Sequence, residues 1–258
     1  MERDVKEYIS QGFPRHPVYL SSNCDAFESS LEERYGDALY SLKTLRDANF
    51  PILIMTKNPS MLLKPEYSNV IDKSRTVIQT TIPFLDSRFE PHAPAPQSRL
   101  KAVGELVDKG FKAVVRLDPV VPSSGTVEGQ SEEEINGLVE HASGLGVKYL
   151  VSKCLRLSIG IKKLYPDFYD QLKPCFRAHG ERESQSVWVL RQDVKEKLLT
   201  PVYQACKRNE VAFFTCMDHV PFPETRLCDG TEEILGHGFV RTDNSILEKE
   251  TTQGAVSR

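Results

Sequence analysis

Six short apolar runs recur along this chain, and each ends abruptly in polar residues. The runs cover residues 17–20, 50–55, 75–78, 111–115, 147–151 and 211–214, and helical stretches follow most of them. Alternating strands and helices are typical of a parallel sheet, in which one βα unit takes roughly 30 residues or more. Parallel α/β barrels build their active sites at the carboxyl ends of the strands. Because Asp, Lys, Gln, Arg and Thr stand at these ends, the pattern predicts an α/β enzyme scaffold. The alternative is that polar residues simply begin the loops after buried strands.

Three of the helices expected between these strands carry end signals. Residues 96–109 have an apolar stripe and are followed by Gly110, where glycine commonly ends a helix. Residues 131–144 begin Ser-Glu-Glu-Glu, which places a cap and acids at the positive end of the helix dipole. A further helix is expected over residues 31–48, with Ser30 and Glu33 spaced as a capping box.

The longest interval between runs lies before the sixth run. It holds two expected helices, residues 165–177 and 193–208, with a polar loop around residues 180–186 between them. This extra length suggests an insertion at about residues 158–190.

The length of 258 residues suits one α/β barrel or two small domains. We predict a single unit over residues 1–241 and a polar tail over residues 242–258. The net charge of −3 gives no overall attraction to nucleic acid or to an anionic membrane. No apolar stretch approaches the roughly 20 residues that span a bilayer, and the charged N-terminus does not resemble a secretory signal. We therefore expect a cytoplasmic protein that does not enter membranes.

The chain has six cysteines, and no two lie closer than ten positions: Cys24, Cys154, Cys175, Cys206, Cys216 and Cys228. This spacing excludes a Cys-x2-Cys motif and favours reduced thiols over a disulfide framework. Cys216, His219, Cys228 and His237 form a string of side chains of the types that bind zinc. The spacing matches no standard finger, so ordinary thiols and a surface histidine remain the alternative, and we assign no metal ligand.

Four segments together resemble the spore photoproduct lyase-like branch of the radical S-adenosylmethionine (SAM) enzymes, also called DNA repair photolyase-like. The resemblance runs from about residue 18 to residue 157 and more loosely to residue 229. Its segments are Val-Tyr-Leu-Ser-Ser-Asn-Cys-Asp at 18–25 with Glu32 following, Phe-Pro-Ile-Leu-Ile-Met-Thr-Lys-Asn at 50–58, Gln-Thr-Thr-Ile at 79–82 with Glu-Pro-His-Ala-Pro-Ala-Pro-Gln-Ser-Arg-Leu at 90–100, and Val-Arg-Leu-Asp-Pro-Val-Val-Pro at 115–122.

The family's defining loop, Cys-x3-Cys-x2-Cys, is not in this sequence. In the family that loop holds a [4Fe–4S] cluster on a βα unit ahead of the matching region. The residues before Val18 instead look like the end of a helix, with Val5, Tyr8 and Ile9 at helical spacing and Gly12 able to stop it. We therefore expect an incomplete parallel (β/α) barrel that misses its first unit. Three explanations are open: the gene product is truncated, a partner chain supplies the missing unit, or the fold has lost the cluster and been repurposed.

The resemblance implies where SAM would bind. Lys57 would meet the SAM carboxylate or a nearby oxygen, and Arg116 would pair with the carboxylate as a bidentate donor. Gln79 and Thr81 would face the ribose or methionine part, and Asp118 would accept from a hydroxyl or orient Arg116. Ser22 and Asp25, in the family's Ser-x-x-Asp position, complete the implied cofactor site. The alternative is ion pairing inside the barrel, with Lys57 or Arg116 paired to Asp25 or Asp118.

Cys24 is the catalytic candidate. The lyases carry a hydrogen-donor cysteine at the end of this strand, and the closest alignment places Ser22 or Asn23 there, with Cys24 one or two positions later. The alternative is a small buried thiol, because free cysteine is among the most buried residue types.

A nucleic-acid partner has a modest case in the sequence. A basic strip interleaved with aromatic residues could bind phosphates and stack bases: Lys153, Arg156, Lys162, Tyr165, Lys163, Phe168, Tyr169 and Lys173. The alternative is a solvated helix face.

The sequence leaves two functions open: part of a radical SAM enzyme that is active only with a cluster unit from elsewhere, or a non-catalytic module that binds SAM or nucleic acid. A barrel without its first strand would also leave Val18–Leu20 as an open edge, which predicts self-association or a partner chain there.

Overall fold

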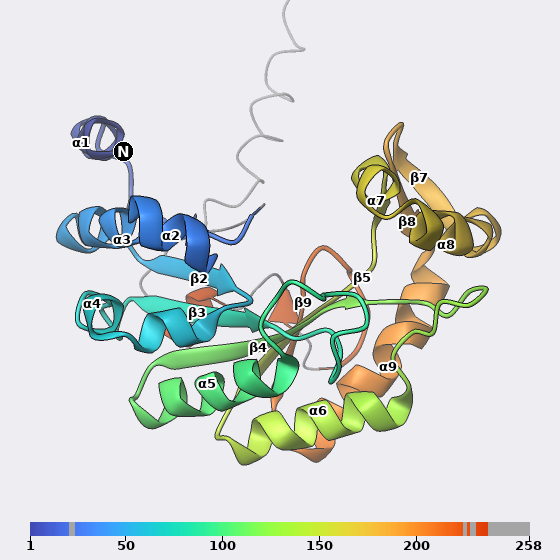
Figure 1. Ribbon diagram of the computed structural model, residues 1–258. Helices are drawn as coiled ribbons and strands as arrows, with labels where there is room; N and C mark the ends of the chain where they lie inside the picture. The colour runs from blue at the N-terminus through green and yellow to red at the C-terminus, as the bar shows by residue number, and fades with distance from the viewer. Residues whose placement is uncertain (21–23, 224–225, 228–230, 237–258) are drawn as a thin grey trace, which may run out of the picture.

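The structure is a computed structural model that describes all residues except 21–23, 224–225, 228–230 and 237–258. Its centre is a seven-stranded parallel sheet, curved so that helices cover the convex face (Figure 1). The sheet order is β1 (Val18–Leu20), β2 (Ile52–Thr56), β3 (Thr76–Thr81), β4 (Lys112–Val120), β5 (Tyr149–Cys154), β9 (Ala212–Thr215) and β10 (Arg226–Leu227).

Every neighbouring pair of strands in this sheet is parallel. The predicted α/β class and the parallel strands near residues 18, 52, 77, 113 and 147 are therefore confirmed. Among the described strands, β1 and β10 do not pair with each other, so they stand at the two edges of an open sheet. The absence of a first βα unit stays a prediction.

The convex layer consists of the helices that connect successive strands: α2 (Ser29–Tyr35), α3 (Asp37–Asp47), the 3-10 helix η1 (Pro59–Leu63), α4 (Pro65–Ser68), α5 (Pro96–Asp108), α6 (Glu132–Gly144) and α9 (Gln192–Arg208). Alternate residues of each strand face opposite sides of a sheet. Ile52 and Ile54 of β2, for example, belong to the large core under these helices, whereas Leu53 belongs to a second cluster on the concave face.

The helix ends confirm two predictions. Gly110 follows the end of α5 with a φ of 79°, a left-handed conformation that glycine adopts without strain. Ser131 caps α6 and forms a complete capping box with Glu134.

Two other local predictions were wrong. The helix expected over residues 31–48 is divided into α2 and α3 at Gly36, whose φ of 67° ends the first helix. The cap of α2 is Glu28, whose carboxylate accepts from Ser30 and Leu31, so Ser30 and Glu33 do not form the capping box. The longer acidic side chain of Glu28, two positions before Ser30, took the role that the Ser-x-x-Glu pattern suggested for Ser30.

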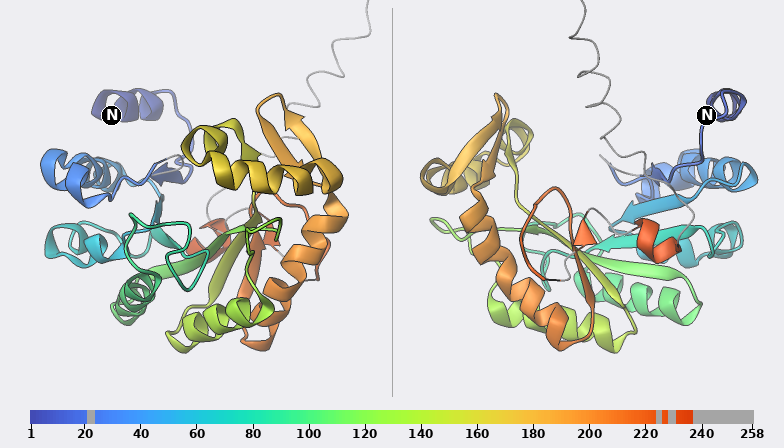
Figure 2. Two further views of the ribbon diagram at one scale, coloured as in Figure 1. Left: turned by 45° about the vertical axis from the view of Figure 1, so that its right-hand side comes forward. Right: turned by 180° about the vertical axis from the view of Figure 1, so that it is seen from behind.

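The region expected as an insertion forms a small unit of its own, which we call the arm (residues 157–190). It has an antiparallel sheet of β6 (Leu157–Ser158), β8 (Val187–Leu190) and β7 (Gly180–Ser184), with helices α7 (Ile159–Leu164) and α8 (Pro166–His179) beside it. The loop expected at residues 180–186 is thus largely a β-hairpin. The arm rises from one side of the sheet, whereas α1 (Glu2–Ser10) and α2 lie on the other (Figure 2). Its status as an insertion stays a prediction.

Candidate functional site

The concave face of the sheet has an apolar floor. Leu53, Val77, Val114, Val151 and Phe214 form this floor, and Ile234 of the short helix α10 (Thr231–Leu235) packs on it. One end of the concave face is therefore filled by side chains. Side chains repeat on one face of a strand with a period of two. Two positions later, toward the carboxyl ends, Gln79, Arg116 and Lys153 therefore form a polar layer on β3, β4 and β5, whereas Met55 of β2 still packs on the floor.

Arg116 lies at the centre of this polar layer. Its Nη1 donates to Gln79 Oε1 at 2.6 Å, and its Nη2 donates to Asp118 Oδ2 at 2.6 Å. Lys153 Nζ lies 3.9 Å from the same oxygen of Asp118. Arg116 and Asp118 thus form the ion pair that the sequence analysis considered as the alternative, and the role of Asp118 toward a ligand stays a prediction.

Arg116 remains charged although it is buried. Burial by itself lowers the pKa of the guanidinium, but Asp118 and, more weakly, Cys216 raise it, and the net pKa shift is upward. Cys216 directly follows the end of β9, two positions after Phe214. Because its side chain acts on the pKa of Arg116, it also belongs to the polar layer. Its proximity to Arg116 was missed in the sequence, where Cys216 was considered only as part of the string with His219, Cys228 and His237.

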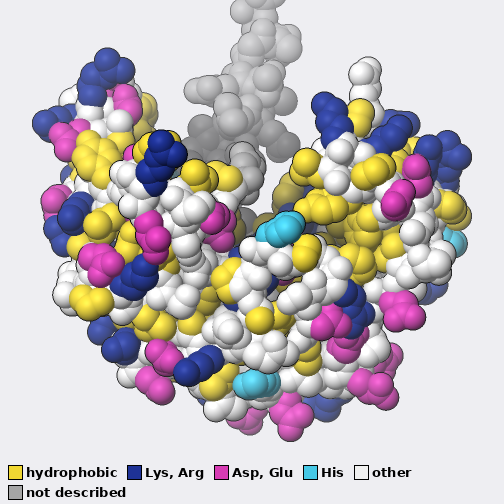
Figure 3. All heavy atoms as spheres, in the orientation of Figure 1, with side chains coloured by type: hydrophobic (Ala, Val, Ile, Leu, Met, Phe, Trp, Pro, Cys, Tyr) yellow, Lys and Arg dark blue, Asp and Glu magenta, His cyan; other side chains and the backbone are white. Residues whose placement is uncertain are grey.

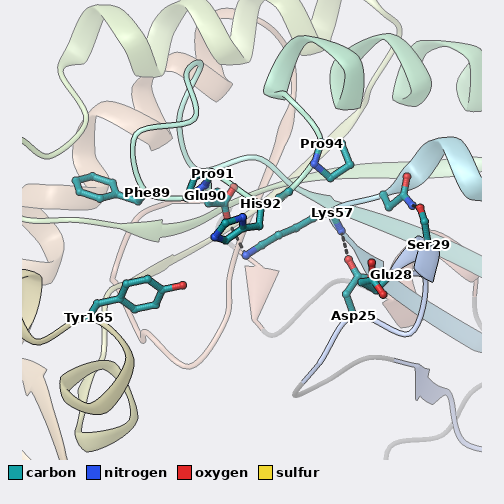
Figure 4. Close-up of a pocket in the computed structure, with 12 residues that line it drawn as sticks. Asp25, Glu28, Ser29, Lys57, Phe89, Glu90, Pro91, His92, Pro94 and Tyr165 are labelled. Carbon is teal, nitrogen blue, oxygen red and sulfur yellow. Dashed lines mark hydrogen bonds and ion pairs between the residues drawn. The ribbon is translucent and has the colours of Figure 1, made fainter. Parts of the chain in front are cut away.

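A pocket of about 520 Å³ lies at the carboxyl ends of β1 and β2 (Figure 4). Its walls come from the loop after β1, the loop after β2, the long loop before α5, and Tyr165 at the start of the arm's α8. The Lys57 ammonium reaches across it to Glu90, with a distance of 2.6 Å between Nζ and Oε1. The Lys57 side chain is 44% exposed, so its charge is open to a ligand that enters the pocket.

Asp25 fastens two of these loops to each other. Its carboxylate accepts from the backbone N–H of Phe27 and Lys57 and from the Thr56 hydroxyl, at 3.0, 2.7 and 2.9 Å. The ion pair considered between Lys57 and Asp25 is therefore not the one formed, because the ammonium of Lys57 pairs with Glu90 and only its backbone meets Asp25. Asp25 fixes the position from which Lys57 extends.

Arg99 pairs with the second carboxylate oxygen of Glu90 from the interior of the protein. The Arg99 side chain is fully buried, and its Nη1 lies 2.6 Å from Glu90 Oε2. It also donates to the carbonyl oxygens of Pro94 and Thr81, at 2.6 and 2.8 Å. Burying an arginine is tolerated only when it is paired and hydrogen-bonded. The sequence segment at residues 90–100 contained both Glu90 and Arg99, but no spacing rule indicated that they would meet.

The loop before α5 also contacts the arm. The Phe89 ring lies 5.1 Å from Phe84 of the same loop and 5.0 Å from Phe168 of α8, measured between ring centroids. The residue next to Glu90 thus connects the central unit with the arm. Figure 3 shows the hollow between the arm and the side of the molecule that carries α1 and α2.

The remaining predicted site residues are placed as follows. Cys24 is exposed beside Asp25, so the alternative of a buried thiol is wrong for it. Thr81 ends β3 on the concave side and is partly exposed. Ser22 and Asn23 lie outside the described residues. Glu32, part of the sequence resemblance, is buried and caps α3 by accepting from the N–H of Ala38 and Leu39.

The basic strip is only partly available. Lys153 and Arg156 form ion pairs with Asp118 and Glu183, and Tyr169 is buried under Lys162. The Phe168 ring already packs against the Phe89 ring. Exposed side chains of the strip include Lys162, Lys163 and Tyr165 on the arm.

The Cys-His string does not form a described metal site. Cys216 is partly buried and His219 is exposed, whereas Cys228 and His237 lie outside the described residues. Within the part of the chain that the structure describes, no three His, Cys, Asp or Glu side chains are grouped so that they could hold a metal. These residues therefore do not fit a [4Fe–4S] cluster. No helix in the same part is long and apolar enough to cross a membrane.

Sequence comparison identified no relative: no family model matches the chain, and no curated protein matches it. Solved structures do resemble it. A spore photoproduct lyase variant with bound AdoMet and dinucleoside spore photoproduct superposes with a TM-score of 0.60 at 14% identity, over 88% of this chain and 64% of that one. A second spore photoproduct lyase variant gives a TM-score of 0.58 at 15% identity with the same coverage. SuiB from Streptococcus suis gives 0.51 at 14% identity, over 86% of this chain and 44% of its own.

These likenesses concern the fold. The chain has an α/β fold that resembles the fold of radical SAM enzymes such as spore photoproduct lyase. It spans 64% of the length of the spore photoproduct lyase chains. The α/β fold that the sequence resemblance implies is thereby confirmed.

Proposed function

We propose that this chain is a radical SAM-type protein of the spore photoproduct lyase-like branch that binds S-adenosylmethionine at the carboxyl ends of its strands. The observation that carries this proposal is the pocket in which the partly exposed Lys57 ammonium stands at the end of β2. A SAM carboxylate suits such a cation, because charge-assisted hydrogen bonds are the strong ones. The likeness to a lyase that was solved with AdoMet supports the same ligand class.

The residues around Lys57 fit SAM better than a cluster. Asp25 fixes the backbone of Lys57, and Gln79 and Thr81 stand on the neighbouring strand for the ribose or methionine part. Arg116 already donates to Gln79 and Asp118, so we assign it the positioning of these two side chains and Lys57 the main anchor. The exposed thiol of Cys24 keeps its assignment as hydrogen donor.

Radical chemistry would need a unit that this sequence does not contain. SAM bound to a reduced [4Fe–4S] cluster supplies a 5′-deoxyadenosyl radical, while the protein orients it and excludes water. The cysteines of this chain are dispersed, so we propose that a cysteine-bearing unit outside these 258 residues supplies the cluster.

A second candidate is a module that binds SAM or nucleic acid without catalysis. One observation favours it: Arg116 is engaged by internal acceptors. The exposed Lys162, Lys163 and Tyr165 of the arm are the contacts that we propose for a nucleic acid, since lysine binds phosphate and an aromatic ring stacks on a base.

Calorimetry with S-adenosylhomocysteine tests the ligand. We expect weak binding to the native chain and roughly tenfold weaker binding to Lys57→Met, because one charged contact to a carboxylate is lost. Absence of binding to the native chain would refute the proposal. Anaerobic reconstitution then separates the two candidates: an enzyme requires a cluster absorption band once a cysteine-bearing partner is added, whereas the binding module shows none with any partner.

A further inference from the structure

Glu90 divides its carboxylate between two cations from different elements. Its Oε1 meets Lys57 Nζ, from the end of β2, and its Oε2 meets Arg99 Nη1, from the first turn of α5, each at 2.6 Å. Figure 4 shows the Lys57 side chain crossing the pocket to reach Glu90. The Glu90 side chain is 13% exposed, so one edge of this ion pair borders the pocket.

The donors of Arg99 are not all used. A guanidinium carries five N–H donors. Nε donates to Pro94, and Nη1 donates to Thr81 and Glu90, which accounts for three of them. The other two belong to Nη2, which is buried and has no hydrogen-bond partner among the described residues. An unpaired buried donor is costly, so it needs an explanation.

The geometry of the pair supplies one. Arginine and a carboxylate prefer to form two parallel hydrogen bonds. Glu90 forms one bond to Arg99 because its second oxygen is bound by Lys57. If Lys57 had another anionic partner, Oε1 of Glu90 would be released beside a guanidinium whose Nη2 lacks an acceptor.

We propose that Glu90 is an exchangeable counter-ion of Lys57. An anionic group of a ligand, a carboxylate in the case of SAM, takes Lys57, and Oε1 of Glu90 turns onto Nη2 of Arg99. Both cations are paired before and after the exchange, so a ligand binds Lys57 without leaving the charge of Glu90 or of the buried Arg99 unpaired. A neutral ligand cannot displace Glu90, and the exchange therefore selects ligands that carry an acid group. Where the ligand is taken to be SAM, the inference rests on the proposed function. The exchange itself requires only that the ligand carry an anionic group.

The first test needs no ligand. Lys57→Met keeps the unbranched shape of the side chain, one atom shorter, and removes its charge, so a crystal structure of this variant mimics the state in which Lys57 no longer pairs with Glu90. We expect both Glu90 oxygens on Arg99, one on Nη1 and one on Nη2. A Glu90 that keeps a single bond to Arg99 or turns into the pocket would overturn the proposal.

The second test measures binding. Glu90→Gln removes the competing charge and leaves Arg99 an amide oxygen, so S-adenosylhomocysteine should bind roughly three- to tenfold more tightly than to the native chain. 5′-Methylthioadenosine, which lacks the carboxylate, should bind both proteins equally. Unchanged or weaker binding of S-adenosylhomocysteine to a folded Glu90→Gln protein would contradict the exchange.

A matched control is available outside the pocket. Glu33 forms an exposed ion pair with Lys64, 3.1 Å away, and Glu33→Gln should leave both affinities unchanged. Thermal unfolding checks that Glu90→Gln is folded. If neither the native chain nor Glu90→Gln binds S-adenosylhomocysteine, the assignment of SAM fails, and the Lys57→Met structure still decides whether Glu90 exchanges between its two cations.

Discussion

Single carboxylates organise much of this molecule. Glu32 is buried, accepts from two N–H groups at the start of α3, and accepts from the Tyr67 hydroxyl at 2.8 Å. Burial, followed by the hydrogen bond to Glu32, raises the pKa of Tyr67, so the hydroxyl stays protonated and donates. Asp218 similarly accepts from the backbone of Cys154 and pairs with Lys195 of α9 at 3.0 Å. These two acids therefore act in folding.

We predict that Glu32→Ala lowers the free energy of unfolding by about 2–4 kcal/mol, because it removes a helix cap and leaves buried donors unpaired. The neighbouring Glu33 forms only an exposed ion pair with Lys64. Glu33→Ala should therefore cost less than about 1 kcal/mol. Urea denaturation measures both, and equal effects would contradict the structural role of Glu32.

The cysteines should differ in reactivity. Burial raises the pKa of Cys206 to about 12, and burial followed by the charge of Asp218 raises that of Cys154. A raised thiol pKa means less thiolate at pH 8, and the thiolate is the reactive form. We expect iodoacetamide at pH 8 to modify the exposed Cys24 and to spare Cys154 and Cys206, as mapped by mass spectrometry. In denaturant the three should react alike; protection that persists there would have another cause.

At the scale of elements, the long loop between β3 and α5 connects the central sheet with the arm, beside the loop after β4, where Ser124 donates to the Gln171 carbonyl of α8. It carries Glu90 toward Lys57 and Phe89 toward Phe168 of α8. Arg88 of the same loop pairs with Asp86 at 2.7 Å and contacts Glu134 of α6. One loop thus supplies both a polar and an apolar contact at the pocket.

We predict that Phe89→Ala loosens this connection, since an aromatic pair contributes about 0.5–1.5 kcal/mol beyond its buried area. Hydrogen exchange should become faster in the loop before α5 and in α8, while α6 remains protected. The control is Phe222→Ala, which removes a ring stacked on Tyr203 at 4.9 Å, away from the arm. Faster exchange in α8 for both variants would indicate general destabilisation instead.

At the scale of the whole molecule, the described sheet has an open edge at β1 with exposed aromatic residues near it. Tyr19 of β1 is 45% exposed, and Phe13 and Tyr40 are 50% and 47% exposed. An apolar groove beside β1 is lined by Val5, Tyr8 and other residues of the N-terminal segment. Open edges present unpaired backbone groups, and exposed apolar patches mark interaction surfaces.

We predict that the protein self-associates, or binds a cysteine-bearing partner, through this edge. Light scattering should show an apparent mass that rises with concentration, and Tyr19→Lys should reduce it, because charge on an edge strand disfavours pairing. Tyr35→Lys, at an exposed position of α2, is the matched control. A monodisperse monomer at high concentration would refute the prediction.

The sequence by itself determined six of the parallel strands in order and two helix ends, because apolar periodicity and capping residues act over a few positions, but it missed the division at Gly36 and the hairpin of the arm. It also indicated the strand end that Lys57 follows, whereas the strand end expected before Arg116 was wrong, because β4 continues past Arg116 to Val120. The nearby pair of Arg116 and Asp118 was one of the alternatives that the sequence offered, but only the tertiary structure decided the distant partners, since Arg116 also meets Gln79 from another strand and Lys57 meets Glu90 from a distant loop. Pairing between residues 33 or more positions apart depends on how the chain packs, and local pattern carries no information about it.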